Sequence, residues 1–167
     1  MKYSDAPTTR AKIEINAAAE KVWQIVTDLQ TPALTSAEFR GAEWLDGAVE
    51  PVVGARFVGR NAHRAIGEWE TTCVVSVADK PHEFAYIVGD PANPGAVWRY
   101  LIEPSGSGNG VVVQQIAQIG PGPSGLSPAI ERMPEKEDRI VERRLQEHHA
   151  GITANLEQIK KLAESAE

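Results

Sequence analysis

The sequence predicts an α+β fold, in which a curved antiparallel sheet of seven strands wraps around one long C-terminal helix. Three observations predict it. One alternating segment near the N-terminus precedes a short amphipathic helix, residues 40–120 then carry six segments with a period of two, and the C-terminal segment carries a helical apolar stripe. Packing the long helix on the sheet buries the hydrophobic face of each.

The N-terminal elements are a strand and two short helices. Residues 9–16 (TRAKIEIN) alternate apolar with charged side chains, which is typical of a half-buried strand. Asn16 stands where a helix N-cap belongs, just before AAAEKVWQIVTDLQ, whose apolar residues recur at helical spacing. Pro32 interrupts this helix, and a second short helix is expected over about 31–38.

Six further strands are expected to form a meander. The stretches between them are rich in turn-forming residues, as in GDPANPG and PSGSGNG, so short loops join neighbouring strands. The spaced glycines of PSGSGNG resemble a nucleotide-binding loop, but no strand-to-helix context surrounds them, which favours a hairpin turn. The expected strands lie at about 41–45, 55–63, 68–78, 83–89, 96–103 and 110–119.

The long helix is expected over about 134–164, after the Gly/Pro-rich segment GPGPSGLSP at 120–128. That segment is a candidate hinge for movement of the helix. A sheet of seven strands is too wide for the side chains of one helix to fill, which predicts a cavity between them. The apolar stripe of the helix consists of Val141, Leu145, His148, Ile152, Leu156 and Ile159.

This order of elements resembles a known family. The segments IEINAAAEKVWQIVTD, PVVGARFVGRN, GEWETTCVV, EFAYIV and AVWRYLIEP, with the closing helix, are similar to the START/Bet v 1-like (SRPBCC) superfamily. Within it, they resemble the bacterial polyketide cyclase/dehydrase and lipid-transport group over nearly the whole chain. The resemblance implies a helix-grip fold with a ligand cavity under the last helix. It implies no single activity, because the group contains cyclases, hydrolases, lipid carriers and receptors and has no universal catalytic motif.

The strand at 68–78 indicates which side chains face the helix. Trp69 and Cys73 belong to its more apolar set, whereas Glu68 and Glu70 belong to the alternate set, so the first set is expected to face inward. The same alternation orients the neighbouring strands, and His148 faces the sheet from the helix. The expected ligand-binding residues are Phe57, Asn61, His63, Trp69, Thr71, Cys73, Tyr86, Trp98, Tyr100, Gln115 and His148. Their mixture of apolar and sparse polar groups is typical of a small-molecule pocket.

A three-residue loop at 64–66 predicts the register of the first hairpin. It aligns Phe57 with Cys73 and Asn61 with Trp69. It also sets Arg60 opposite Glu70 on the outer face, where an exposed ion pair contributes under about 1 kcal/mol. The outward carboxylates are therefore not expected to be an acid/base pair.

Four residues are candidates for acid/base chemistry: His63, His148, Tyr86 and Tyr100. His148 is either a general base or a histidine of the helix–sheet interface whose nitrogens have local partners. Cys73 is either an inert buried hydrophobe or a nucleophile, and the second role needs an adjacent base.

Composition excludes several classes of function. The net charge of −6 argues against a nucleic-acid partner, and no segment has the length and hydropathy of a signal peptide or membrane span. The single cysteine and four histidines lack metal-binding spacing, so neither metal nor cofactor is expected. The expectation is one cytoplasmic domain over 1–167, as a monomer or a homodimer paired through an edge strand such as 41–45.

Two functions are compatible with these residues. The first is binding or carriage of a small hydrophobic molecule such as a lipid, a polyketide or an aromatic metabolite. The alternative is a polyketide cyclase or dehydratase that uses the same cavity, where substrate positioning and one acid/base group do the chemistry.

Overall fold

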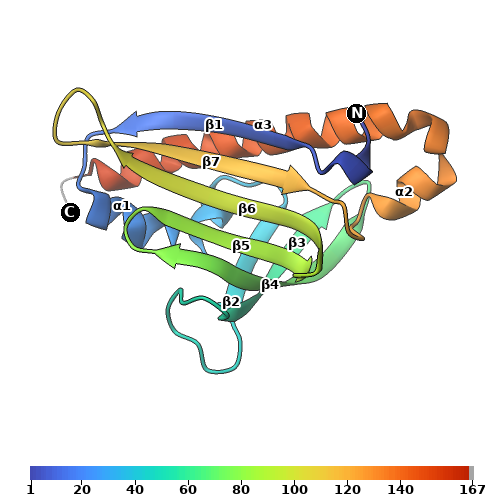
Figure 1. The fold of residues 1–167 in the computed structure, drawn as a ribbon, viewed down its shortest axis with the longest axis horizontal. Helices are drawn as coiled ribbons and strands as arrows, with labels where there is room; N and C mark the ends of the chain where they lie inside the picture. Colours follow the sequence, from blue (N-terminus) through green and yellow to red (C-terminus); the bar gives the residue numbers. More distant parts are fainter. Residues whose placement is uncertain (166–167) are drawn as a thin grey trace.

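The computed structural model, which describes residues 1–165, has one seven-stranded antiparallel sheet beside one long helix (Figure 1). The strand order is β1-β7-β6-β5-β4-β3-β2, so β1 and β2 form the two edges. The strands are β1 (Thr8–Ile15), β2 (Phe39–Trp44), β3 (Arg56–His63), β4 (Gly67–Asp79), β5 (Glu83–Asp90), β6 (Asn93–Pro104) and β7 (Val111–Ile119). The helices are η1 (Tyr3–Asp5), α1 (Ala19–Val26), η2 (Thr31–Leu34), α2 (Ser127–Arg132), η3 (Pro134–Lys136) and α3 (Glu137–Ala163).

The helix α3 packs along β1 and β7 and is anchored near both of its ends (Figure 1). Toward its C-terminus, Ile152, Leu156 and Ile159 are buried in the main core with α1 and the sheet. Toward its N-terminus, Val141 and Leu145 join a smaller core. The middle of the helix therefore spans the concave side of the sheet, as the helix-grip fold predicted. None of the helices within 1–165 is long and apolar enough to cross a membrane.

The predicted register of the central strands is confirmed. Phe57 pairs with Cys73 and Asn61 pairs with Trp69 between β3 and β4. Tyr86 pairs with Trp98 between β5 and β6.

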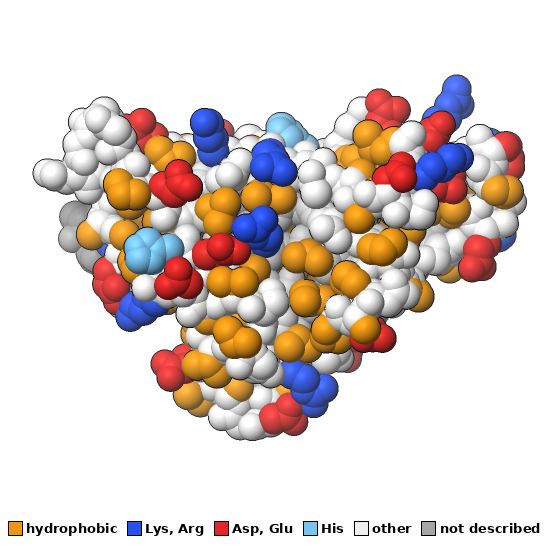
Figure 2. Space-filling model, in the orientation of Figure 1, with side chains coloured by type: hydrophobic (Ala, Val, Ile, Leu, Met, Phe, Trp, Pro, Cys, Tyr) orange, Lys and Arg blue, Asp and Glu red, His pale blue; other side chains and the backbone are white. Residues whose placement is uncertain are grey.

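Charged side chains of both signs are scattered over the face shown in Figure 2, and hydrophobic ones gather low in that view, where the β2–β3 loop lies.

The expected ion pair of Arg60 is wrong. Its Cα lies opposite Glu70, but its guanidinium contacts Glu43 of β2, with 3.1 Å between Nη1 and Oε1. Across β2, Arg60 faces Gly41, where a Cβ would lie 3.4 Å from Nη2 of the arginine. Because the glycine leaves this space free, the guanidinium reaches the diagonal carboxylate instead.

Two boundaries near the N-terminus also differ from the prediction. The N-cap of α1 is Ala18, whereas the backbone N–H of Asn16 donates to Oε2 of Glu164 at 2.8 Å. Asn16 therefore connects the end of β1 to the end of α3. The second helix is the single 3-10 turn η2, shorter than the expected 31–38.

The Gly/Pro-rich segment after β7 is hydrogen-bonded at its start, and a hinge over 120–128 stays a prediction. The N–H groups of Gly120 and Gly122 donate to the carbonyls of Gly95 and Pro94, at 2.8 and 2.7 Å. The hydroxyl of Tyr3 donates to the carbonyl of Gly122 at 2.6 Å.

Candidate ligand cavity

A cavity of about 630 Å³ lies between the concave face of the sheet and the middle of α3. Strands β3 to β7 supply its wall, and η2 and the segment after β7 border it. This volume is within the range of small-molecule sites. The helix α3 is packed near both of its ends, and the cavity lies beneath the part between them, which Gly151 borders.

Aromatic side chains form one continuous wall of the cavity. Phe57 and Tyr86 meet edge to face with ring centroids 5.1 Å apart, and Phe84 stacks on Tyr100 at 6.3 Å with an angle of 11°. Such edge-to-face and stacked contacts between rings restrict the motion of the rings and add to the stability gained by their burial. The wall is therefore a preorganised apolar surface.

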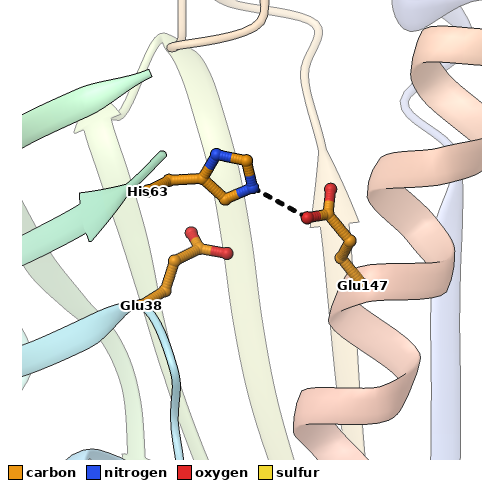
Figure 3. Close-up of side chains that lie close together, drawn as sticks. All are labelled: Glu38, His63 and Glu147. Atoms are coloured by element: carbon orange, nitrogen blue, oxygen red, sulfur yellow. Dashed lines mark hydrogen bonds and ion pairs between the residues drawn. The ribbon is translucent and has the colours of Figure 1, made fainter. Parts of the chain in front are cut away.

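Ten of the eleven residues expected to bind ligand border this cavity. The exception is His63, whose imidazole points to Glu147 of α3 (Figure 3). Contact with a ligand stays a prediction for all of them. The bordering residues are Phe57, Asn61, Trp69, Thr71, Cys73, Tyr86, Trp98, Tyr100, Gln115 and His148.

His148 is a neutral imidazole that faces the cavity. Its ring meets Trp98 edge to face, with centroids 5.0 Å apart, and it makes no hydrogen bond with any described residue. Burial, and secondarily the charge of Arg144, lowers the pKa of His148 to about 3. The expectation of local hydrogen-bond partners is therefore wrong, and a nitrogen of such low basicity is a weak general base.

Cys73 and Tyr86, two further groups on the wall of the cavity, are also held in their neutral forms. Burial raises the pKa of the Cys73 thiol to about 12, and the only polar contact of its sulfur among the described residues is Thr71 Oγ1 at 3.9 Å. Burial likewise raises the pKa of Tyr86 well above its usual value. Cys73 is thus held as a thiol, which favours the first of its two predicted roles, a buried hydrophobe.

Hydrogen bonds and ion pairs connect four residues at the rim of the cavity, Glu38, His63, Arg144 and Glu147. Figure 3 shows three of them, Glu38, His63 and Glu147. Nε2 of His63 lies 2.8 Å from Glu147, and Nδ1 accepts the backbone N–H of Ala65 at 3.0 Å. The proton of the neutral ring is therefore on Nε2, which donates to the carboxylate. The guanidinium of Arg144 donates two hydrogen bonds to Glu38, at 2.6 and 2.8 Å, and lies 3.8 Å from Glu147.

The same network brings together three potential metal ligands. Oxygens of Glu38 and Glu147 and a nitrogen of His63 lie within 4.8 Å of one another. The arrangement does not suit a metal, however. The nitrogen of His63 that faces the carboxylates carries the proton, and Arg144 already neutralises Glu38.

A second polar cluster, which is buried, borders the cavity. Nδ2 of Asn155 donates to the hydroxyl of Tyr100 at 2.9 Å and to Oε1 of Gln115 at 3.0 Å. All three side chains are at most 4% exposed. They join α3 to β6 and β7 beneath the aromatic wall.

Sequence reasoning missed several residues of the site. Arg144, Glu147, Gly151 and Asn155 follow one face of α3 with His148, at steps of three and four. That spacing was visible, but only apolar residues and His148 had been assigned to the inward stripe. Glu38 carried no comparable signal, because it lies in the irregular segment before β2.

The comparison with protein families identifies the chain. A family model described as "Polyketide cyclase / dehydrase and lipid transport" matches residues 6–164. The chain belongs to this family. The family and the fold fit a protein that binds hydrophobic ligands, and the family match specifies no ligand. A comparison with curated proteins gives no match.

Solved structures of the polyketide cyclase/dehydrase type share this architecture. A polyketide-cyclase-like protein from Corynebacterium glutamicum is 28% identical, with a TM-score of 0.60 over 94% of this chain and 89% of its own. A protein from Mesorhizobium loti is 16% identical, with a TM-score of 0.61 over 96% and 99%. The di-domain ARO/CYC protein BexL from the BE-7585A biosynthetic pathway is 14% identical, with a TM-score of 0.69 over 96% and 51%. The last two likenesses concern the fold alone.

Proposed function

We propose that this protein binds a small hydrophobic molecule, such as a lipid, a polyketide or an aromatic metabolite, between its sheet and α3. The observation that carries the proposal is the 630 Å³ cavity with its continuous aromatic wall. Membership of the polyketide cyclase/dehydrase and lipid transport family agrees with it.

The electrostatics of the cavity favour an uncharged ligand. His148, Cys73 and Tyr86 are neutral near pH 7, so the charged groups that border the cavity are side chains such as Glu38, Arg144 and Glu147. The charges of Glu38 and Arg144 neutralise each other at the rim. Moving an ionised group past this rim into an apolar interior would be costly, whereas an uncharged ring system gains from burial.

Two measurements test the proposal directly. Native mass spectrometry of protein purified from its own host should reveal a co-purified apolar molecule. A fluorescent apolar probe should bind with one-to-one stoichiometry and be displaced by lipid extract from the same cells. The proposal is wrong if no extract component and no apolar probe binds.

Substitution of Gly151 tests whether the cavity is the binding place. Gly151 borders the cavity, and a Cβ built there meets no atom within 4 Å. Gly151→Trp should fill part of the cavity and weaken probe binding at least about tenfold. The helix itself should not be destabilised, because glycine is a poorer helix former than tryptophan. The matched control, Gly151→Ala, should bind the probe as the wild type does and be more stable by up to about 1 kcal/mol. If Gly151→Trp binds the probe with the affinity of the wild type, the probe does not bind in this cavity.

A second candidate function is a cyclase or dehydratase reaction in the same cavity. The observation that favours it is the carboxylate of Glu147, which borders the cavity. This carboxylate accepts a hydrogen bond from Nε2 of His63 and lies 3.8 Å from Arg144. Such a carboxylate, oriented by a donor, is a better candidate base than the weakly basic His148.

The test of this second function is turnover of a polyketide-like substrate by wild type and by Glu147→Gln. Glu147→Gln should lower kcat by about 100-fold or more, because it removes the base and keeps the shape. Affinity for the apolar probe should stay unchanged. Unchanged turnover in Glu147→Gln, or the absence of turnover in the wild type, favours a carrier.

A further inference from the structure

The buried polar cluster of Tyr100, Gln115 and Asn155 has unused hydrogen-bonding capacity. Both protons of the Asn155 amide nitrogen are used, by Tyr100 and by Gln115. Oδ1 of Asn155 is buried and has no donor within residues 1–165. In these two bonds the hydroxyl of Tyr100 and the carbonyl oxygen of Gln115 act as acceptors, so the donor groups of both side chains are not used by Asn155.

This deficit is unusual for a folded protein. Buried polar groups are nearly always paired, and each unpaired group costs about 1–3 kcal/mol. Phe84 and Ile152, which also border the cavity, are apolar and offer no partner. A further polar group bound in the cavity beside Asn155 would complete the cluster.

We infer that the cluster formed by Tyr100, Gln115 and Asn155 binds a hydroxyl group of the ligand, and that the ligand is a hydroxylated ring compound such as a phenol. This inference rests on the proposed binding function. A hydroxyl donates to the free carbonyl oxygen of Asn155 and accepts from the amide of Gln115 or the hydroxyl of Tyr100. A ketone only accepts hydrogen bonds, so it leaves the oxygen of Asn155 without a donor. A hydrocarbon neither donates nor accepts, so it pairs with none of these groups.

The hydroxyl also suits either orientation of the Asn155 amide. A half-turn of the amide exchanges its oxygen and nitrogen, and the unpaired position then holds a donor in place of an acceptor. A hydroxyl matches both cases because it donates and accepts. The stacked rings of Phe84 and Tyr100 beside the cluster favour a flat ring as the bearer of this group.

The experiment compares two probes that differ by one hydroxyl. Dissociation constants of naphthalene and 2-naphthol, which is uncharged at pH 7, are measured for the wild type and for Asn155→Leu. The ratio of the naphthalene constant to the 2-naphthol constant should fall at least about tenfold in Asn155→Leu, as expected for loss of a buried hydrogen bond. Because each ratio is taken within one variant, general changes in cavity shape largely cancel.

Two further variants keep the test decisive. Tyr100→Phe preserves the shape of the wall and should also lower the ratio, even if Asn155→Leu folds poorly. Tyr86→Phe removes a hydroxyl that borders the cavity outside the cluster and should leave the ratio unchanged. A ratio that responds only to Tyr86→Phe would place the hydroxyl elsewhere and overturn the inference.

The remaining outcomes separate this inference from the proposed function. If both probes bind the wild type and the ratio is the same in Asn155→Leu and Tyr100→Phe, the cluster holds only water. The inference is then wrong and the proposed function stands. If neither these probes nor any other apolar molecule binds the wild type, the proposed function fails and the inference fails with it.

Discussion

At the scale of single residues, burial beside the cavity decides the chemistry of His148. The residue type alone suggests a group that titrates near neutrality. Its position beside Trp98 and Arg144 lowers the pKa of His148 to about 3. Burial against the apolar wall disfavours the charged imidazolium, and the positive charge of Arg144 disfavours it further. The side chain therefore stays neutral across the physiological range.

This shift makes the stability of the protein depend on pH. Between about pH 6.5 and pH 3 the unfolded chain binds a proton at His148 that the folded protein does not bind. The contribution of His148 to stability is thus complete above pH 6.5 and is lost as the pH falls toward 3. From pH 7 to pH 5 the loss amounts to roughly 2 kcal/mol.

His148→Phe should remove this part of the pH dependence. Urea unfolding at pH 7 and pH 5 should therefore show a smaller difference for His148→Phe than for the wild type, by roughly 2 kcal/mol. The matched control is His149→Phe, because His149 is the exposed neighbour on the same helix. Equal pH dependence in His148→Phe and the wild type would show that folding does not lower the pKa of His148.

Alternation along the strands predicted most of the residues that border the cavity. It placed Phe57, Tyr86 and Trp98 on the inner face because strand periodicity depends only on neighbouring residues. His63 has the same parity but ends β3, where its ring turns toward α3. Asn155 was missed because a polar residue on an apolar helical stripe is recognisable only when its partners are known.

At the scale of elements, Arg144 connects α3 to the segment before β2. Its side chain is 10% exposed and that of Glu38 is 23% exposed, so both charges are largely removed from water. Glu147 provides a second carboxylate near the guanidinium. Loss of the arginine would leave two carboxylates close together without a counter-charge, which is strongly unfavourable.

Arg144→Met should therefore lower the free energy of unfolding by about 2 kcal/mol, somewhat less than for a fully buried pair. Urea unfolding at constant slope measures the change. Arg143→Met is the matched control, since Arg143 is exposed, and it should change stability little. The double variant Arg144→Met/Glu38→Gln should recover part of the loss. An unaltered stability in Arg144→Met would mean that the network contributes nothing.

At the scale of the whole molecule, two separate cores keep the cavity open. The main core fixes the C-terminal half of α3 against the sheet, and the smaller core around Tyr3, Ile119 and Val141 fixes the other end. The hydroxyl of Tyr3 reinforces the smaller core through Gly122. Since both ends are packed, the middle of the helix cannot collapse onto the sheet, and the space beneath it persists.

The sequence by itself determined the order of the elements, the register of the central strands and the faces they present. These properties follow from periodicity, turn residues and charge alternation, which act between residues close in the chain. Only the tertiary structure decided what lies opposite each face. Arg144 and Glu38 are 106 positions apart and His63 and Glu147 are 84 apart, so no local pattern encodes their pairing. The size of the cavity and the unpaired oxygen of Asn155 depend likewise on how α3 packs across the sheet.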